Sequence, residues 1–231
     1  MNKRKLRWAQ FKAAAGGMSL SQELLQGARA LLQLALEERR RPVYRAETNH
    51  YSSYAPGGIV LLVDALEAWL NELIVYLWPF SHQQAQRCLA FEPPRKKYYE
   101  IPRQFASVAI PENADLDLVI ELRHEIAHYL PRGIPEEGNV PEWFRQLHQQ
   151  GMFITTGESE ADFVLGAKLG SYRLAYWVWE TVDSAVSNLA NALGQEAEPA
   201  KWTASNFTCY RVVCSPSQLP QYDLKHKLCL T

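Results

Sequence analysis

Apolar residues recur at intervals of three and four along most of this chain, and this spacing restricts the fold more than any other feature. Such a spacing places apolar side chains on one face of an α-helix. No stretch alternates apolar and polar residues for long enough to predict a sheet. The sequence therefore predicts an all-α protein built as a helical bundle.

Four long helices and one short helix are expected, with capping or helix-breaking residues at their ends. Ser19 and Ser21 precede the first helix, and Pro42 follows its basic last turn. The predicted spans are 19–41, 59–78, 114–130 and 171–193, with the short helix between Pro141 and Gly151. A Pro-rich, basic segment at 93–102 and a polar connector that ends in Pro56, Gly57 and Gly58 are predicted to be loops.

These elements suggest three parts of the chain. Residues 1–18 are predicted to be a basic tail, residues 19–195 a helical domain, and residues 196–231 a less regular C-terminal extension. A short extended piece is expected near Phe207–Val213 within that extension. The five tryptophans of the predicted helices lie at helical spacing among aliphatic residues, which favours core packing over base stacking; they are Trp69, Trp78, Trp143, Trp177 and Trp179.

Charge and cysteine content narrow the class of protein. The formal net charge is −1, which argues against a protein that coats nucleic acid or membranes over its whole surface. The basic N-terminus lacks the apolar core of a secretion signal, and no stretch is apolar enough for a membrane span. The four cysteines lie apart and form no metal or disulfide pattern: Cys88, Cys209, Cys214 and Cys229. We therefore expect a cytoplasmic protein with reduced thiols and no membrane association.

The window ELRHEIAHYLPR, residues 121–132, supports two incompatible mechanisms. The first is zinc-dependent hydrolysis, because His124, Glu125 and His128 match HExxH, in which two histidines bind zinc and the glutamate activates water. A catalytic zinc ion needs a third protein ligand. The candidates downstream are His148, Glu158, Glu160 and Asp162.

The second mechanism is metal-free cleavage of RNA. Arg123 can neutralise the charge that a phosphate gains in the transition state, and His128 can transfer a proton near neutral pH. On one straight helix these two residues would point about 140° apart. They would meet through a second helix across a dimer interface, or through distortion before Pro131.

The chain resembles the HEPN domains, a family of α-helical bundles whose active members carry an Arg, four to six residues and a His. Arg123, His124 and His128 match that pattern. The resemblance also includes the segments before and after the motif, GGIVLLVDALEAWLNELI (57–74) and SYRLAYWVWETVDSAVSNL (171–189). It covers roughly residues 20–195 in helix order.

This resemblance implies a homodimer in which two motif helices face each other, and an endoribonuclease that needs no metal or other cofactor and leaves a 2′,3′-cyclic phosphate. Arg123 and His128 would be catalytic, with His124 and Glu125 shaping the site. Many family members are toxins or defence effectors, so an antitoxin or a nucleotidyltransferase partner is a further expectation. The tyrosine that such partners modify is replaced by Leu130, whereas Tyr129 adjoins His128.

Other interpretations of the same residues stay open. Glu67, Asn71 and Tyr129 are candidate substrate-binding residues, and Glu67 and Asn71 can also hydrogen-bond the Arg123 guanidinium or a loop backbone. Arg123 can pair with a neighbouring glutamate on its own helix, and the helix dipole would favour His128 at the helix end. The basic residues 95–97 are expected to be solvated, with phosphate contact as the alternative. A third hypothesis for the whole chain is an inactive helical interaction module.

Overall fold

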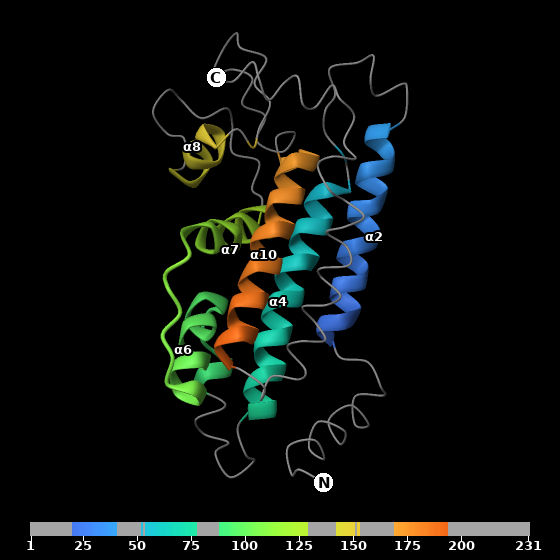
Figure 1. Ribbon diagram of the computed structural model, residues 1–231. Helices are drawn as coiled ribbons and strands as arrows, with labels where there is room; N and C mark the ends of the chain where they lie inside the picture. Colours follow the sequence, from blue (N-terminus) through green and yellow to red (C-terminus); the bar gives the residue numbers. More distant parts are fainter. Residues whose placement is uncertain are drawn as a thin grey trace.

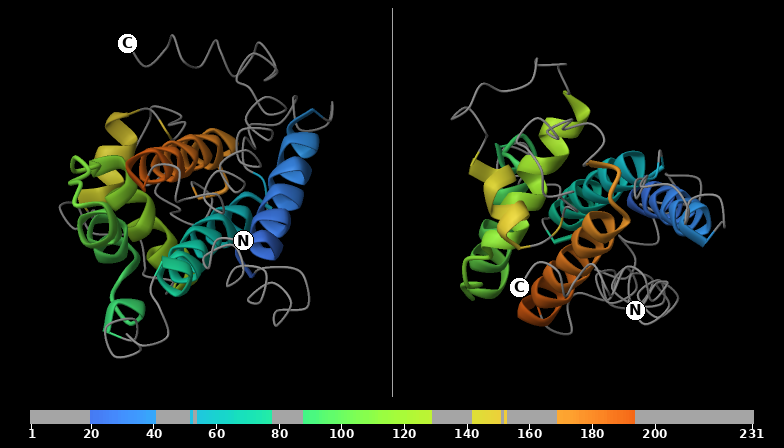
Figure 2. Two further views of the ribbon diagram at one scale, coloured as in Figure 1. Left: turned by 60° about the horizontal axis from the view of Figure 1, so that its bottom comes forward. Right: turned by 90° about the horizontal axis from the view of Figure 1, so that it is seen from above.

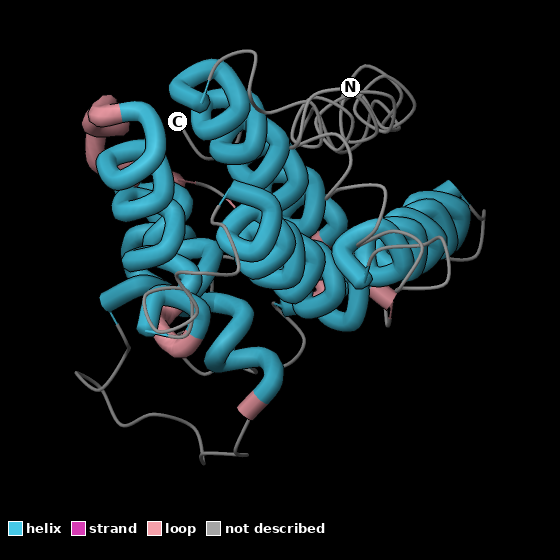
Figure 3. The backbone as a smooth tube through the Cα atoms, turned by 90° about the horizontal axis from the view of Figure 1, so that it is seen from below, coloured by secondary structure: helices cyan, strands magenta, loops and turns pink. Residues whose placement is uncertain are grey.

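The structure is a computed structural model that describes residues 20–40, 52, 54–77, 88–128, 142–150, 152 and 169–193. Its main helices are α2 (Leu20–Arg40), α4 (Ala55–Leu77), α6 (Pro94–Ala106), α7 (Ala114–Ala127), α8 (Glu142–Gln149) and α10 (Tyr172–Leu193). These described residues are mostly helical and contain no strand, which confirms the prediction of an all-α protein for that part (Figure 3). Within the same ranges no helix combines the length and apolarity that crossing a bilayer requires.

Helix α4 is the centre of the bundle. It packs most extensively against α2 and also contacts α10, α6 and α7. Helix α10 lies beside α4, while α6 and α7 lie on the opposite side of this pair from α2 (Figures 1 and 2). Helix α8 packs only at the outer side of this group, where it contacts α7. The central position of α4 agrees with its mostly apolar circumference.

Close packing between α2 and α4 explains why α4 begins earlier than predicted. The helix starts at Ala55 rather than Ile59, so the predicted connector residues Gly57 and Gly58 are helical. A Cβ atom on Gly58 would lie 2.7 Å from Leu32 Cδ2, so a larger residue here would force the Leu32 side chain or the helices to shift. Pro56 is compatible with a first helical turn because its missing N–H has no acceptor there.

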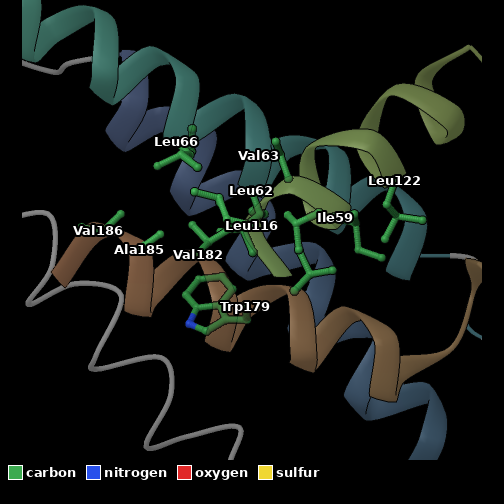
Figure 4. Close-up of a cluster of buried hydrophobic side chains, with 14 of the residues drawn as sticks. Ile59, Leu62, Val63, Leu66, Leu116, Leu122, Trp179, Val182, Ala185 and Val186 are labelled. Atoms are coloured by element: carbon green, nitrogen blue, oxygen red, sulfur yellow. The ribbon is translucent and has the colours of Figure 1, made fainter. Parts of the chain in front are cut away.

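The core is formed where α4, α7 and α10 meet. Side chains from these three helices interdigitate in Figure 4, in which Leu62 and Leu66 of α4 lie near Leu116 of α7 and Val182 of α10. Trp69, Trp143 and Trp179 are buried and Trp177 is partly buried, so the core-packing prediction is confirmed for these tryptophans. Trp78 lies outside the described residues.

The segment predicted to be a basic loop is instead the helix α6. Pro94 occupies its start, where proline is tolerated, and Ser107 ends it in the left-handed conformation with φ 56°. Its buried residues are Lys97, Tyr98, Ile101 and Pro102, so the prediction that residues 95–97 are solvated is wrong for Lys97. The prolines led to the prediction of a loop, although the apolar residues of this segment recur at intervals of three and four, as in a helix.

Two helix starts are held by side chains. Ser171 caps α10 as predicted, since its Oγ accepts a hydrogen bond of 3.4 Å from the Leu174 N–H. The start of α2 is held from another helix, because the Glu72 carboxylate of α4 accepts bonds from the Ser21 N–H (3.0 Å) and Oγ (2.7 Å). The predicted basic tail and C-terminal extension, with the expected extended piece, lie outside the described residues.

Candidate functional site

The candidate site lies at the C-terminal end of α7, where the helix leaves the core. Asn113 caps the other end by accepting a bond from the Leu116 N–H, and Leu116, Val119 and Leu122 are fully buried. After Leu122 the side chains become accessible: Arg123 and Glu125 are half-buried, and His124 and His128 are exposed. The anchored half of α7 thus presents the motif residues to solvent.

Helix α4 positions the Arg123 guanidinium. Asp64 Oδ1 accepts a hydrogen bond of 2.8 Å from Arg123 Nε and lies 2.6 Å from Nη2. The carboxylate that pairs with Arg123 is therefore Asp64, and not Glu121 or Glu125 on the same helix. A charge-assisted contact at two nitrogens restricts the arginine more than a single contact would.

One edge of this guanidinium stays available. Asp64 engages Nε and Nη2, and Nη1 has no partner among the described residues. The Arg123 side chain keeps 30% of its surface exposed, and Asp64 keeps 27%. Because an arginine has five N–H donors, a held arginine can still meet an oxyanion through its outer edge.

The two histidines of the motif lie against each other. The ring centroids of His124 and His128 are 4.6 Å apart, with the ring planes tilted by 53°. Their spacing of four residues places both on one side of the helix end. Two accessible imidazoles thus lie one and five residues after the Asp64-bound arginine in the sequence.

Helix α7 ends sooner than predicted, at Ala127 rather than Leu130. His128 is the C-cap residue, with φ −111° and ψ 26°, and its N–H donates to the His124 carbonyl at 3.0 Å. The angle of about 140° applies to a straight helix. It still holds approximately for His128, because the His128 N–H bonds the His124 carbonyl as in a further helical turn and the His128 ring lies against that of His124.

The other predicted site residues lie apart from this arrangement. Glu67, one turn after Asp64 on α4, pairs with Lys97 of α6 at 3.0 Å instead of with Arg123. Asn71 has a buried Oδ1 atom with no hydrogen-bond partner among the described residues. Tyr129 lies outside the described residues. Asp64 was not singled out from the sequence, although its spacing of three residues from Glu67 puts both on one face of α4.

The residues that could complete a metal site are only partly described. In the ranges that the structure covers, no group of three His, Cys, Asp or Glu side chains is arranged to hold a metal ion. His124 and His128 are near enough to share one. The predicted third ligands Glu158, Glu160 and Asp162, and the His148 side chain, lie outside the description.

Comparisons with known proteins give no relative for this chain. No protein-family model matches it, and no curated protein or solved structure matches it either. The functional proposal therefore rests on the motif with its resemblance to the HEPN domains and on the geometry of this chain.

Proposed function

We propose that this protein is a HEPN-like, metal-independent endoribonuclease that acts as a homodimer and uses Arg123 and His128. The observation that carries the proposal is the arginine held by Asp64, whose Nη1 has no partner among the described residues, followed in the motif by two accessible histidines. Phosphodiester transfer needs a cation that stabilises the phosphate charge and a group that transfers a proton, and an arginine and an imidazole can supply these two functions.

In the proposed reaction the nucleophile comes from the RNA. The ribose 2′-oxygen loses its proton and attacks the adjacent phosphorus, and the bond from phosphorus to the 5′-oxygen breaks. The products are a 2′,3′-cyclic phosphate and a free 5′-hydroxyl. Arg123 would stabilise the extra negative charge on the phosphate. His128 would either take the 2′-hydroxyl proton or give a proton to the leaving 5′-oxygen, and a water molecule would carry out the other proton transfer.

Asp64 would act as a positioning residue in this proposal. It holds the Nε side of Arg123, so that the guanidinium need not be ordered at the moment of reaction. The same carboxylate offsets part of the arginine charge. We therefore expect a small RNA footprint, in agreement with the formal net charge of −1.

A zinc-dependent hydrolase is the second candidate function, favoured by the short separation of the two imidazoles. His124 and His128 would be ligands, with Glu125 as general base. The two proposals differ in what they require. The ribonuclease needs Arg123 and no metal, whereas the hydrolase needs both histidines, a third ligand and a bound ion.

The test is cleavage of a mixed RNA substrate by the full-length protein in excess EDTA. We expect cleavage with 2′,3′-cyclic phosphate ends, and its loss in Arg123→Ala and in His128→Ala. Arg103→Ala is the matched control, because Arg103 is an exposed arginine that pairs at 3.3 Å with Glu100 of its own helix.

Activity that disappears in EDTA and returns with zinc would overturn the ribonuclease proposal in favour of the hydrolase. If folded, dimeric protein cleaves no RNA either in EDTA or with zinc, the remaining hypothesis is the inactive helical interaction module. Equal activity in Arg123→Ala and Arg103→Ala would also contradict the assigned role of Arg123.

A further inference from the structure

His124 and His128 have the spacing and the exposure that a transition-metal ion needs from two imidazole ligands. Both side chains are exposed, and their ring centroids are 4.6 Å apart. The His128 N–H donates to the His124 carbonyl at 3.0 Å, which keeps the two residues one helical turn apart. An imidazole nitrogen binds zinc at about 2.1 Å. Small side-chain rotations would therefore bring one nitrogen of each ring to the same ion.

Two carboxylates lie on the same side of α7 as the histidines. Glu121 is three residues before His124, and Glu125 is three residues before His128, a spacing that makes side chains neighbours on a helix. Glu121 is exposed and Glu125 is half-buried, and neither forms an ion pair with another described residue. Their negative charges favour a divalent cation beside the two rings.

An ion bound here would have two protein ligands among the described residues. In the described ranges no third His, Cys, Asp or Glu is arranged with the histidines to hold a metal ion. Water would then complete the coordination. Such a site differs from the zinc centre of a hydrolase, in which three protein ligands hold the ion.

Metal binding and the proposed proton transfer compete for the same imidazole. A neutral imidazole accepts a proton with one nitrogen lone pair, and a metal ion bound to that nitrogen occupies the pair. The ion would also hold the His128 ring beside His124. That position is on the outer side of α7, turned about 140° from the direction of Arg123. A metal-bound His128 could therefore not serve the reaction.

We propose that His124 and His128 bind one divalent transition-metal ion and that this ion inhibits RNA cleavage. The inhibition rests on the proposed ribonuclease function, whereas the binding follows from the geometry of the two rings. Zn²⁺ and Ni²⁺ suit imidazole ligands, and Cu²⁺ should bind more tightly than either. Mg²⁺ should not bind, because it prefers oxygen ligands.

The first test measures binding without any RNA. Zn²⁺ is titrated into the full-length, metal-free protein, and the imidazole nitrogens are followed by ¹H–¹⁵N NMR. We expect one nitrogen each of His124 and His128 to shift together. In His124→Gln the zinc affinity of this site should fall at least about tenfold, the size of effect found even for residues that only support a metal ligand.

The neighbouring carboxylate gives a finer test of the same site. Glu121→Gln should weaken zinc binding by about twofold, because it removes one exposed charge beside the ion. Glu37→Gln is the matched control, since Glu37 is an exposed glutamate on α2. The melting temperature of each variant checks that the fold is kept.

The second test measures inhibition. Cleavage of RNA by metal-free protein is followed as Zn²⁺ is added, with Mg²⁺ at the same concentrations as the control for ionic strength. Zinc should inhibit the unaltered protein, and Mg²⁺ should not. Each variant is compared with its own rate in EDTA, and the zinc concentration that halves this rate should rise at least about tenfold in His124→Gln.

Four results would overturn the proposal, and they fail in different ways. Equal zinc affinity of His124→Gln and the unaltered protein would exclude the metal site. Zinc bound at the histidines with unchanged cleavage would exclude the inhibition and leave the ribonuclease intact. Cleavage that requires zinc would favour the hydrolase over both proposals. If no RNA is cleaved with or without zinc, the inhibition fails together with the ribonuclease, and the NMR titration alone decides the metal site.

Discussion

Asp64 and Glu67 lie one helical turn apart on α4, and each forms an ion pair with a neighbouring helix. The two pairs differ in how far their cations are exposed to water. Asp64 contacts Arg123 of α7, whose side chain is 30% exposed. Glu67 contacts Lys97 of α6 at 3.0 Å, and the Lys97 side chain is only 1% exposed. Both pairs join α4 to a neighbouring helix, yet only the cation of the first can be reached from solvent.

The difference separates a structural ion pair from one that can take part in chemistry. A buried lysine must keep its carboxylate, because its charge would otherwise be left unpaired in a poorly solvated place. A half-exposed arginine loses less when its partner is removed, and it can still bind an anion. We therefore expect changes at Lys97 and Glu67 to affect stability, and changes at Arg123 and Asp64 to affect activity.

The largest expected effect is on catalysis, in Arg123→Ala. Loss of the group that stabilises phosphate charge should lower the rate of RNA cleavage by about a thousandfold, or about 4 kcal/mol. Thermal unfolding should change little, because the pair with Asp64 is half-exposed. Single-turnover cleavage and the melting temperature are the two measurements. A large loss of stability with unchanged cleavage would contradict this expectation, because the pair of Arg123 with Asp64 would then be structural.

The next effect is on stability, in Glu67→Ala. This change leaves Lys97 buried without its carboxylate, and we expect the free energy of unfolding to fall by about 3 kcal/mol in urea titrations. Glu100→Ala is the control, since Glu100 pairs with Arg103 on the same helix and near the surface. Equal stability of Glu67→Ala and Glu100→Ala would show that burial of the cation does not determine how much the loss of its carboxylate destabilises the fold.

A smaller effect is expected for Asp64→Asn. The amide keeps the shape of the side chain but weakens its hold on Arg123, so the cleavage rate should fall by about tenfold. Because Asp64 acts through Arg123, it should have no effect in a protein that already carries Arg123→Ala. A double-mutant cycle on the cleavage rate measures this dependence, and additive losses would contradict a positioning role.

The smallest effect is expected for Lys97→Met combined with Glu67→Leu. Replacing both partners of a buried pair by apolar residues of similar size is often neutral, so the free energy of unfolding should stay within about 1 kcal/mol of the starting protein. Urea titration of this variant beside Glu67→Ala makes the test. A loss as large as that of Glu67→Ala would mean that the pair itself stabilises the fold.

The course of the helices was largely predictable. The periods of three and four located α2, α7 and α10, and Ser171 caps α10 as its position indicated. The errors have local physical causes. Pro94 and its basic neighbours suggested a loop where proline merely begins α6, and Gly57 and Gly58 suggested a connector where they allow α2 and α4 to approach.

The candidate site was predictable only in part. The motif residues Arg123, His124 and His128 stand out because they lie within one window of sequence. Asp64 was not assigned, because α4 carries several polar residues three or four positions apart, among them Glu67 and Asn71. The residue that pairs with Arg123 is set by the axial register of α4 against α7. The spacing of apolar residues along each helix does not predict that register.

The sequence by itself determined the approximate positions of α2, α4, α7 and α10 and the chemistry that the motif offers, since helix periodicity, caps and side-chain types are properties of neighbouring residues. Only the tertiary structure decided which cations are buried and which carboxylate holds each one. The Asp64 and Arg123 side chains are 59 residues apart in the chain, and they meet because two separately formed helices pack at one particular register.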